Sequence, residues 1–230
     1  MMKLYRKNEM LFSILLIVLY VVVTGTLRSS GDDNPAMMAW LLALTVGLSL
    51  FVWRGGLAEK YGLTGWAKNS RQMLWFVPLW VIATGNLWGG IEPHYPMPGL
   101  AFAMISFALV GFVEELVFRG FLFKAMLAGG SAKTAIIVCA VTFGAGHIVN
   151  LLTGHATFET LVQVVFAIAL GFVFTLVCYK GGSLWPCIIA HSMIDVFSTL
   201  SALNGVMDWI YLGVTFVIAV AYCAYLTRIQ

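Results

Sequence analysis

Gly111-Phe-Val-Glu114-Glu115-Leu-Val-Phe-Arg119-Gly120 is the stretch that decides the fold, because it places three charges inside an apolar run from residue 100 to 126. A charged side chain at the centre of a membrane helix costs roughly 2.5–3.5 kcal/mol on insertion scales. Such residues are rare in membrane spans and usually face the interior of a helix bundle, where they carry function. The stretch therefore predicts a buried site on a membrane helix.

The composition places this stretch in a polytopic membrane protein. Of the 230 residues, 61% are hydrophobic and 10% are charged, whereas a soluble domain carries about 25% charged residues. The mean hydropathy is +0.93. The net charge of +3 is spread along the chain without a basic run, so nucleic acid is not an expected partner. The four cysteines form no CxxC pair, which favours neither a disulfide framework nor a thiolate metal site.

Apolar runs of about 20 residues predict an all-α bundle of about eight transmembrane helices. The first run follows three basic residues but lacks a cleavage motif, so we expect a retained helix rather than a signal peptide. No polar stretch is long enough for a separate core, which predicts a single membrane domain over 1–230 with a motif-bearing core at 99–203. The predicted helices cover 10–27, 36–53, 72–90 (kinked at Pro78), 99–128, 134–152, 159–179, 184–203 and 209–227.

Basic residues gather at alternate ends of the predicted helices. One set of ends holds eleven basic residues, whereas the other holds only Arg28 beside five acidic residues. The positive-inside rule then places both termini in the cytoplasm, in agreement with an even number of spans. The short chain, without targeting extensions, favours a multi-pass protein of a bacterial cell membrane. The eleven residues are Lys3, Arg6, Lys7, Arg54, Lys60, Lys68, Arg71, Lys124, Lys133, Lys180 and Arg228.

The three charges of the opening stretch are expected to have different roles. Glu115 and Arg119 are four residues apart with the acid first, which is the favourable order for an ion pair on a helix. Glu114 lies about 100° further round the helix than Glu115, which predicts that the two carboxylates face different partners. We therefore expect Glu115 and Arg119 to form a structural pair, and Glu114 to be the reactive carboxylate.

Three further ionisable residues, His147, His191 and Asp195, lie inside predicted helices. His191 and Asp195 are four residues apart and share one helix face. At 1.5 Å per residue, these residues and Glu114 lie about 12–21 Å from the basic ends of their helices, near the middle of a ~30 Å hydrocarbon core. We expect them to meet at one depth. Small residues beside them allow close helix approach or leave room for water and substrate: Gly111, Gly120, Gly144, Ala145 and Gly146.

Three motifs occur in order on separate predicted helices: Glu114-Glu115-x-x-x-Arg119, Phe143-x-x-x-His147 and His191-x-x-x-Asp195. They resemble the EExxxR, FxxxH and HxxxN or HxxxD pattern of the CPBP family of intramembrane proteases. That family contains the CAAX prenyl endopeptidases and the bacterial bacteriocin-processing or immunity proteins, also called the Abi family. The resemblance covers roughly residues 100 to 203, with no usable motif in the first three predicted helices.

The resemblance implies an intramembrane glutamic endopeptidase that acts without a metal or other cofactor on a membrane-associated peptide or protein tail. Glu114 would activate water with help from His147, and His191 and Asp195 would stabilise the oxyanion. Family members often carry Asn at the last position, and Asn donates a hydrogen bond directly. Asp195 would instead donate when protonated, or orient His191. The supporting residues are expected to be Glu115, Arg119 and Phe143.

Three other functions stay open at this point. A zinc peptidase using Glu114, His147 and His191 has an acceptable ligand set, but the compact HExxH signature is missing. A non-enzymatic membrane partner, such as a bacteriocin-immunity or sensor-regulating protein, would keep the motifs without turnover. A proton-coupled transporter would also use buried Glu and His, but transporters commonly show internal repeats that this sequence lacks. The expected partners of the peptidase are its substrate and the lipid bilayer.

Overall fold

The computed structural model describes residues 1–148, 157–202 and 204–229. The predicted helix ends at 152 and 203 lie outside these residues. The described residues are organised in helices, which confirms the predicted all-α fold. The elements are α1 (Met2–Lys7), α2 (Glu9–Arg28), α3 (Pro35–Arg54), η1 (Leu74–Phe76), α4 (Val77–Ala83), η2 (Gly85–Leu87), α5 (Gly99–Glu114), the π-helical η3 (Glu115–Leu122), α6 (Phe123–Gly129), α7 (Ala132–Gly146), α8 (Thr157–Gly181), α9 (Trp185–Ser198) and α10 (Val206–Arg228).

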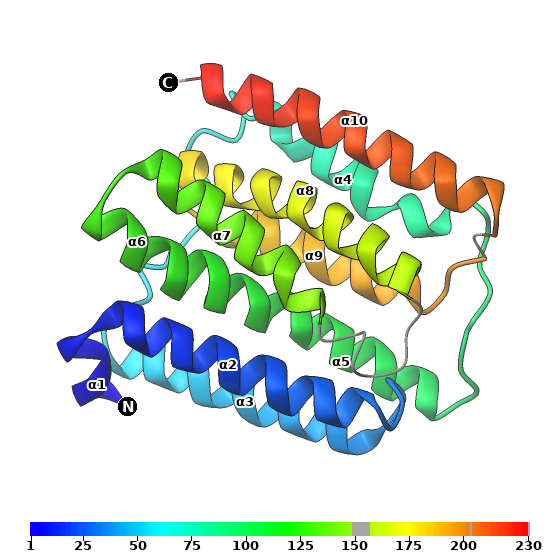
Figure 1. Ribbon diagram of the computed structural model, residues 1–230, viewed down its shortest axis with the longest axis horizontal. Helices are drawn as coiled ribbons and strands as arrows, with labels where there is room; N and C mark the ends of the chain where they lie inside the picture. Colours follow the sequence, from blue (N-terminus) through cyan, green and yellow to red (C-terminus); the bar gives the residue numbers. More distant parts are fainter. Residues whose placement is uncertain (149–156, 203, 230) are drawn as a thin grey trace.

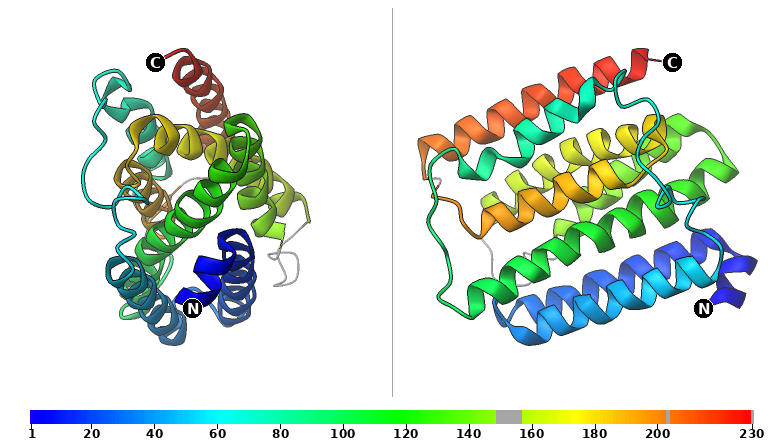
Figure 2. Two further views of the ribbon diagram at one scale, coloured as in Figure 1. Left: turned by 90° about the vertical axis from the view of Figure 1, so that its left-hand side faces the viewer. Right: turned by 180° about the vertical axis from the view of Figure 1, so that it is seen from behind.

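The helices run side by side along the long axis of the bundle (Figures 1 and 2). Helices α2 and α3 form one side, α4 and α10 the opposite side, and α5 to α9 lie between them. Helix α5 packs against both α3 and α9, and α8 packs against α7 and α10. Both termini lie at the same end (Figure 1), which fits an even number of passes. We call the end of the bundle that holds both termini the terminal end, and the opposite end the distal end. The side of the membrane that each end faces stays a prediction.

Five helices of the described residues are long and apolar enough to cross a membrane: α2, α3, the continuous helix from α5 through η3 to α6, α8 and α10. Helix α2 gives evidence for a membrane span beyond its length, because it exposes apolar side chains. Its Leu15, Val18, Leu19 and Val22 are exposed although they are apolar. An apolar face without a protein partner is expected where lipid covers the helix. The structure is therefore that of a polytopic helical membrane bundle.

The third predicted helix, over 72–90, is wrong in its length and in its kink. Leu74, Trp75 and Phe76 have φ angles of 55°, 53° and 59°, a left-handed conformation that interrupts a right-handed helix. Pro78 lies in the first turn of α4, where its missing N–H is not needed. Proline therefore starts this helix instead of bending it. At seven residues, α4 is only about 10 Å long.

A single hydrophobic core runs through the described helices and includes residues from Tyr5 to Leu226. One domain over 1–230 stays a prediction, but no second core separates from this one within the described residues. At the terminal end the core is aromatic, with ring centroids 4.8–6.3 Å apart. We call this group the aromatic cluster; it consists of Tyr5, Phe12, Phe51, Tyr61 and Phe121.

Gly111 permits the close contact between α5 and α9 that positions the charged residues. A Cβ built on Gly111 would lie 2.6 Å from the backbone nitrogen of Ser192 and would also overlap its hydroxyl. The Ser192 hydroxyl donates to the Ala108 carbonyl at 2.9 Å, so the two helices meet backbone to backbone. Of the two roles expected for this glycine, close packing is the one that its surroundings favour.

Substitution Gly111→Ala is expected to destabilise the protein by about 1–3 kcal/mol, the usual cost of overpacking. The added methyl group has to push α9 away from α5, because two of the three nearest atoms that it meets, the nitrogen and Cα of Ser192, are backbone and cannot rotate away. Gly47→Ala on α3 is the matched control, since a Cβ there meets nothing within 4 Å and alanine is the better helix former. Unfolding of both variants in detergent would measure the difference. Equal stability of the two variants would contradict this packing.

Candidate active site

The continuous helix that carries the opening stretch changes its geometry where the charges begin. Helix α5 ends at Glu114, and the π-helical segment η3 begins at Glu115. Widened turns of this kind are rare and occur frequently at functional sites. The Phe118 carbonyl within η3 lies 3.3 Å from the Cys139 thiol, which donates to it. The backbone therefore leaves its regular pattern at the two glutamates.

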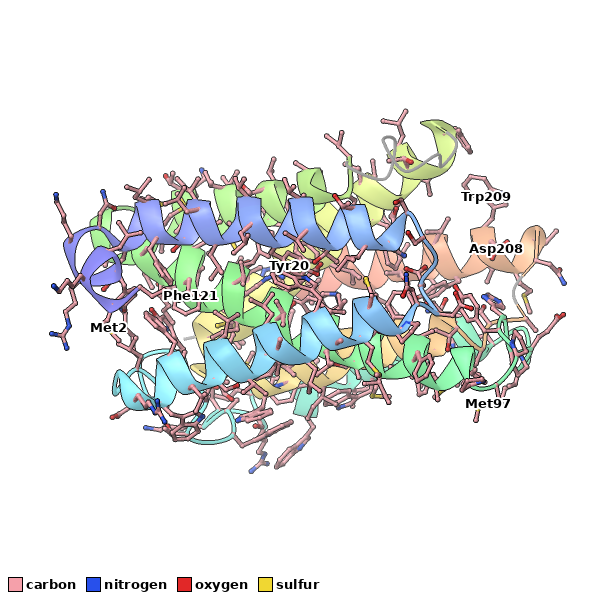
Figure 3. The ribbon with its side chains drawn as sticks, turned by 90° about the horizontal axis from the view of Figure 1, so that it is seen from below. Met2, Tyr20, Met97, Phe121, Asp208 and Trp209 are labelled. Atoms are coloured by element: carbon pink, nitrogen blue, oxygen red, sulfur yellow. The ribbon has the colours of Figure 1, made fainter. Side chains whose placement is uncertain are left out.

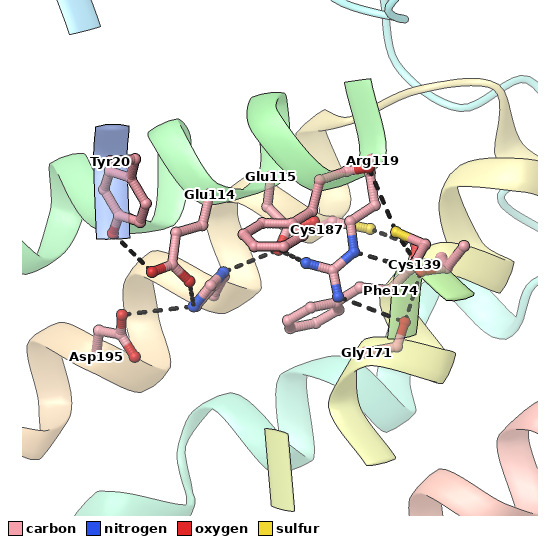
Figure 4. A network of polar contacts seen from close by, with 12 residues as sticks. Tyr20, Glu114, Glu115, Arg119, Cys139, Gly171, Phe174, Cys187 and Asp195 are labelled. Atoms are coloured by element: carbon pink, nitrogen blue, oxygen red, sulfur yellow. Dashed lines mark hydrogen bonds and ion pairs between the residues drawn. The ribbon is translucent and has the colours of Figure 1, made fainter. Parts of the chain in front are cut away.

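Glu115 and Arg119 form the buried ion pair that their spacing predicts. Arg119 Nη1 lies 2.9 Å from Glu115 Oε1, and both side chains are 0% exposed. The guanidinium carbon also lies 4.1 Å from the centre of the Phe143 ring, a distance suited to a cation–π contact. Longer contacts of 3.4 Å join Arg119 to the Thr175 hydroxyl and the Gly171 carbonyl. Arg119 thus connects η3 with α7 and α8 (Figure 4).

Glu115 also holds His191, a contact that the sequence analysis did not predict. His191 Nδ1 lies 2.8 Å from the same Oε1 that accepts from Arg119. The imidazole stands between the rings of Phe143 and Phe174, with centroids 5.6 and 5.5 Å away. Because the Nδ1–H donates to a carboxylate, the second ring nitrogen, Nε2, is directed to the opposite side.

Glu114 and Asp195 lie on that opposite side of His191 (Figure 4). Glu114 Oε2 is 3.7 Å and Asp195 Oδ2 is 3.5 Å from His191 Nε2. Both separations exceed ordinary hydrogen-bond length. The expectation that the two glutamates face different partners is therefore wrong. The His191 ring lies within reach of both glutamates: Glu115 contacts Nδ1, and Glu114 lies nearest to Nε2.

Tyr20 completes the surroundings of Glu114 and was missed by the sequence analysis. Its hydroxyl donates to Glu114 Oε1 at 2.6 Å, from helix α2. The ring is only 4% exposed and lies midway along the bundle (Figure 3). Tyrosines in membrane proteins gather at the two interfaces, so a tyrosine in mid-helix needs a partner for its hydroxyl. The position of Tyr20 in the middle of an apolar run was therefore the feature of the sequence that could have predicted a polar partner for it.

Phe143 lies in the last turn of α7, and His147 directly follows this helix. The helix ends at Gly146, and His147 is its C-cap residue. Glycine disfavours helix continuation, and the Gly144-Ala-Gly146 sequence precedes this end. The rings of Phe143 and His147 are 5.7 Å apart, edge to face. Phe143 is therefore the shared neighbour of His147, His191 and Arg119.

An open cavity of about 510 Å³ lies beside these groups. Its lining includes all four predicted catalytic residues, Glu114, His147, His191 and Asp195, together with Tyr20. The side chains of Glu114 and Asp195 are 14% and 23% exposed, whereas that of Glu115 is fully buried. Water can therefore reach the carboxylate of Glu114 but not that of Glu115. The remaining lining is mostly apolar.

A zinc centre would require several of these side chains to converge on one metal ion. Within the ranges that the structure describes, no group of three or more His, Cys, Asp or Glu side chains is arranged to hold a metal ion. The side chains of the described site are therefore not arranged as a zinc centre.

The fold and this buried network of carboxylates and imidazoles define a multi-pass membrane protein with a polar, water-accessible centre. Residues 96–197 match the family model described as type II CAAX prenyl endopeptidase Rce1-like. This match contains all three motifs and confirms the predicted resemblance to the CPBP/CAAX protease family. At the level of the family, it supports an intramembrane protease. The comparisons with curated proteins and with solved structures found no match.

Proposed function

We propose that the protein is an intramembrane endopeptidase that hydrolyses a peptide bond with water activated by Glu114. The observation that carries this proposal is the position of Glu114: its carboxylate lies beside His191 Nε2 and Asp195, at the wall of an open cavity midway along the bundle. A general base, a potential oxyanion donor and water access are the parts that peptide hydrolysis requires. The family match supports the reaction class.

The two carboxylate oxygens of Glu114 have different surroundings, and this difference indicates which oxygen takes the proton in the proposed reaction. Oε1 accepts from the Tyr20 hydroxyl, and Oε2 is the oxygen nearest His191. Oε2 takes a proton from water while the water oxygen forms a bond to the carbonyl carbon of the substrate. The C–N bond of the resulting tetrahedral intermediate then breaks, and Glu114 returns the proton to the leaving nitrogen. His147, on the same cavity wall, assists Glu114 with the water.

His191 stabilises the oxyanion of that intermediate from Nε2. Glu115 accepts from its Nδ1–H, and Nε2 donates to the oxyanion when the ring carries both protons. Hydrogen bonds of this kind act strongly in a water-poor site. Asp195, at 3.5 Å from Nε2, orients this nitrogen and would donate only when protonated. Glu115, Arg119 and Phe143 hold His191 in place.

The proposed substrate is a membrane-associated peptide or protein tail. The apolar lining of the cavity, which includes Phe107, Val110 and Phe166, fits apolar side chains next to the cleaved bond. The name of the family model refers to prenylated CAAX substrates, and bacteriocin processing is the other activity expected from the resemblance. Assays of the identified substrate with and without a prenyl group would show whether cleavage depends on it.

Comparison of the peptides in cells that express the wild-type protein and cells that express Glu114→Ala tests the proposed function. Peptides with a new C-terminus that appear only with the wild type, together with uncut precursors in the variant, are the expected result. Equal protein levels in the membrane fraction are the required control. Identical peptide sets at equal expression would contradict a peptidase and would favour a non-enzymatic membrane partner.

Substitution Tyr20→Phe is expected to lower kcat about threefold to thirtyfold. A hydrogen bond to a charged group is worth about 1.5–3 kcal/mol, and we expect only part of this energy to be lost from the transition state. The Tyr20 phenol positions Glu114, so KM is expected to change much less. Tyr222→Phe on α10 is a matched control that loses a hydroxyl bonded to the Met73 carbonyl. An unchanged kcat in Tyr20→Phe, or a loss in kcat no larger than that of Tyr222→Phe, would contradict this role.

A further inference from the structure

The cavity beside Glu114 extends toward one end of the bundle only. On α2, α3, α7, α8, α9 and α10 its lining residues lie from mid-helix to the end away from the termini, and Phe118, just past the middle of the continuous α5–η3–α6 helix, reaches furthest toward the termini. Phe158 and Trp209 line its outer part and are 64% and 57% exposed. Trp209 and Asp208 lie at the distal end, far from Met2 (Figure 3). The cavity therefore opens at the distal end.

The terminal end is closed by side chains that pack and bond with each other. The aromatic cluster fills the space between α1, α2, α3 and η3 there. Tyr61 donates to the Tyr5 hydroxyl at 2.8 Å, and both residues are buried. Burial raises the pKa of the Tyr61 phenol, so it stays neutral. Lys60 joins this group to Glu9 through contacts of 2.6 and 2.7 Å. Within the described residues, the cavity lining includes no member of this packed group.

The two ends differ in charge as well as in access. The eleven basic residues assigned to one side of the membrane lie in α1, in the loops or at the helix ends of the closed, terminal end. The distal end has only Arg28, and its guanidinium is 2.8 Å from the Asp32 carboxylate. Asp33, Glu92 and Asp208 add negative charge at this end. The positive-inside rule assigns such an acidic end to the non-cytoplasmic side.

We propose that the substrate enters the site from the non-cytoplasmic side of the membrane. This inference rests on the proposed function and specifies its substrate class: a peptide or protein segment that is exposed beyond the membrane, in place of a tail made and kept in the cytoplasm. Glu114 is fifteen residues from the start of α5, so the segment has to reach about 22 Å along the helix direction. About seven extended residues span that depth.

The sidedness of the cavity can be measured with single cysteines and a membrane-impermeant charged thiol reagent. The native cysteines are buried except for Cys223, which is half-buried, so Cys223→Ala is a suitable background. Ser198→Cys and Val162→Cys place thiols in the cavity wall. Ser30→Cys marks the distal end and Ser131→Cys the terminal end, since both serines are exposed. Each full-length variant is labelled in right-side-out and in inside-out vesicles.

In right-side-out vesicles the reagent is expected to modify Ser30→Cys and at least one of the cavity cysteines at a rate at least tenfold above Ser131→Cys. Inside-out vesicles are expected to reverse this order. Cavity labelling from the same side as Ser131→Cys would overturn the proposal, as would a cytoplasmic location of Ser30→Cys. Failure of both cavity thiols to react from either side, in variants that remain monodisperse in detergent, would overturn it as well.

This measurement separates the direction of access from the peptidase activity. Labelling depends on the path of a small reagent and needs no turnover. A protein that cleaves nothing but shows the expected labelling would retain a distal cavity while losing the proposed function. A protein that cleaves its substrate but labels from the cytoplasmic side would keep the function and lose the proposed route.

Discussion

Substitution Glu114→Gln is expected to lower the cleavage rate by at least about a hundredfold, because general-base catalysis usually contributes about 10²–10⁴. Glutamine keeps the shape of the side chain and an oxygen that can accept from the Tyr20 hydroxyl. It removes only the ability to take a proton from water. The loss should therefore appear in kcat, with KM changed little, when the purified variant is assayed on the substrate identified from cells.

The matched control is Glu59→Gln, an exposed glutamate of the loop between α3 and η1, which should keep the wild-type rate. A double variant adds a second test. Residues that act as one catalytic unit give losses that are far from additive. His191→Gln on the Glu114→Gln background should therefore lower the rate much less than it does alone. A Glu114→Gln rate within about threefold of wild type would show that another group activates the water.

Substitution Arg119→Met is expected to lower the free energy of unfolding by about 3–5 kcal/mol, the cost of leaving a buried charge without its partner. The pair with Glu115 is 0% exposed, and the same Glu115 oxygen also lies 2.8 Å from His191 Nδ1. Without Arg119, the Glu115 carboxylate stays in the core beside aromatic rings. Denaturant unfolding in mixed micelles, followed by tryptophan fluorescence, measures the change.

Two further variants distinguish the loss of the pair from a general effect of removing arginine. Arg71→Met, in an exposed loop position, should change stability by no more than about 0.5 kcal/mol. Glu115→Gln combined with Arg119→Met should be more stable than Arg119→Met alone, because no unpaired charge remains. If the single and double variants were equally unstable, packing of the arginine side chain would account for its role.

The sequence was sufficient for those parts of the structure that depend on local spacing and on composition. Five of the predicted spans are helices long enough to cross a membrane, and Glu115 pairs with Arg119 as their i,i+4 spacing predicts. Both features follow from a single helix, without knowledge of its neighbours. The three motifs also predicted the resemblance that the family model finds over residues 96–197.

Contacts between distant helices could not be predicted in the same way. The Glu115–His191 contact joins residues 76 positions apart and depends on how closely α5 approaches α9 at Gly111. Tyr20 carries no charge, so a search for ionisable residues in apolar helices passes over it. The short α4 results from three left-handed residues before Pro78, which the apolar pattern of 72–90 does not reveal. In each case the missing information is tertiary packing.

The central claim is that hydrolysis depends on Glu114 and not on a bound metal. Its most direct test is to purify the wild-type protein after extensive treatment with chelators, quantify bound metal, and measure turnover of the identified substrate in the same sample. We expect wild-type turnover with bound metal far below one equivalent. Loss of turnover on metal removal, with recovery on adding Zn²⁺, would contradict the account.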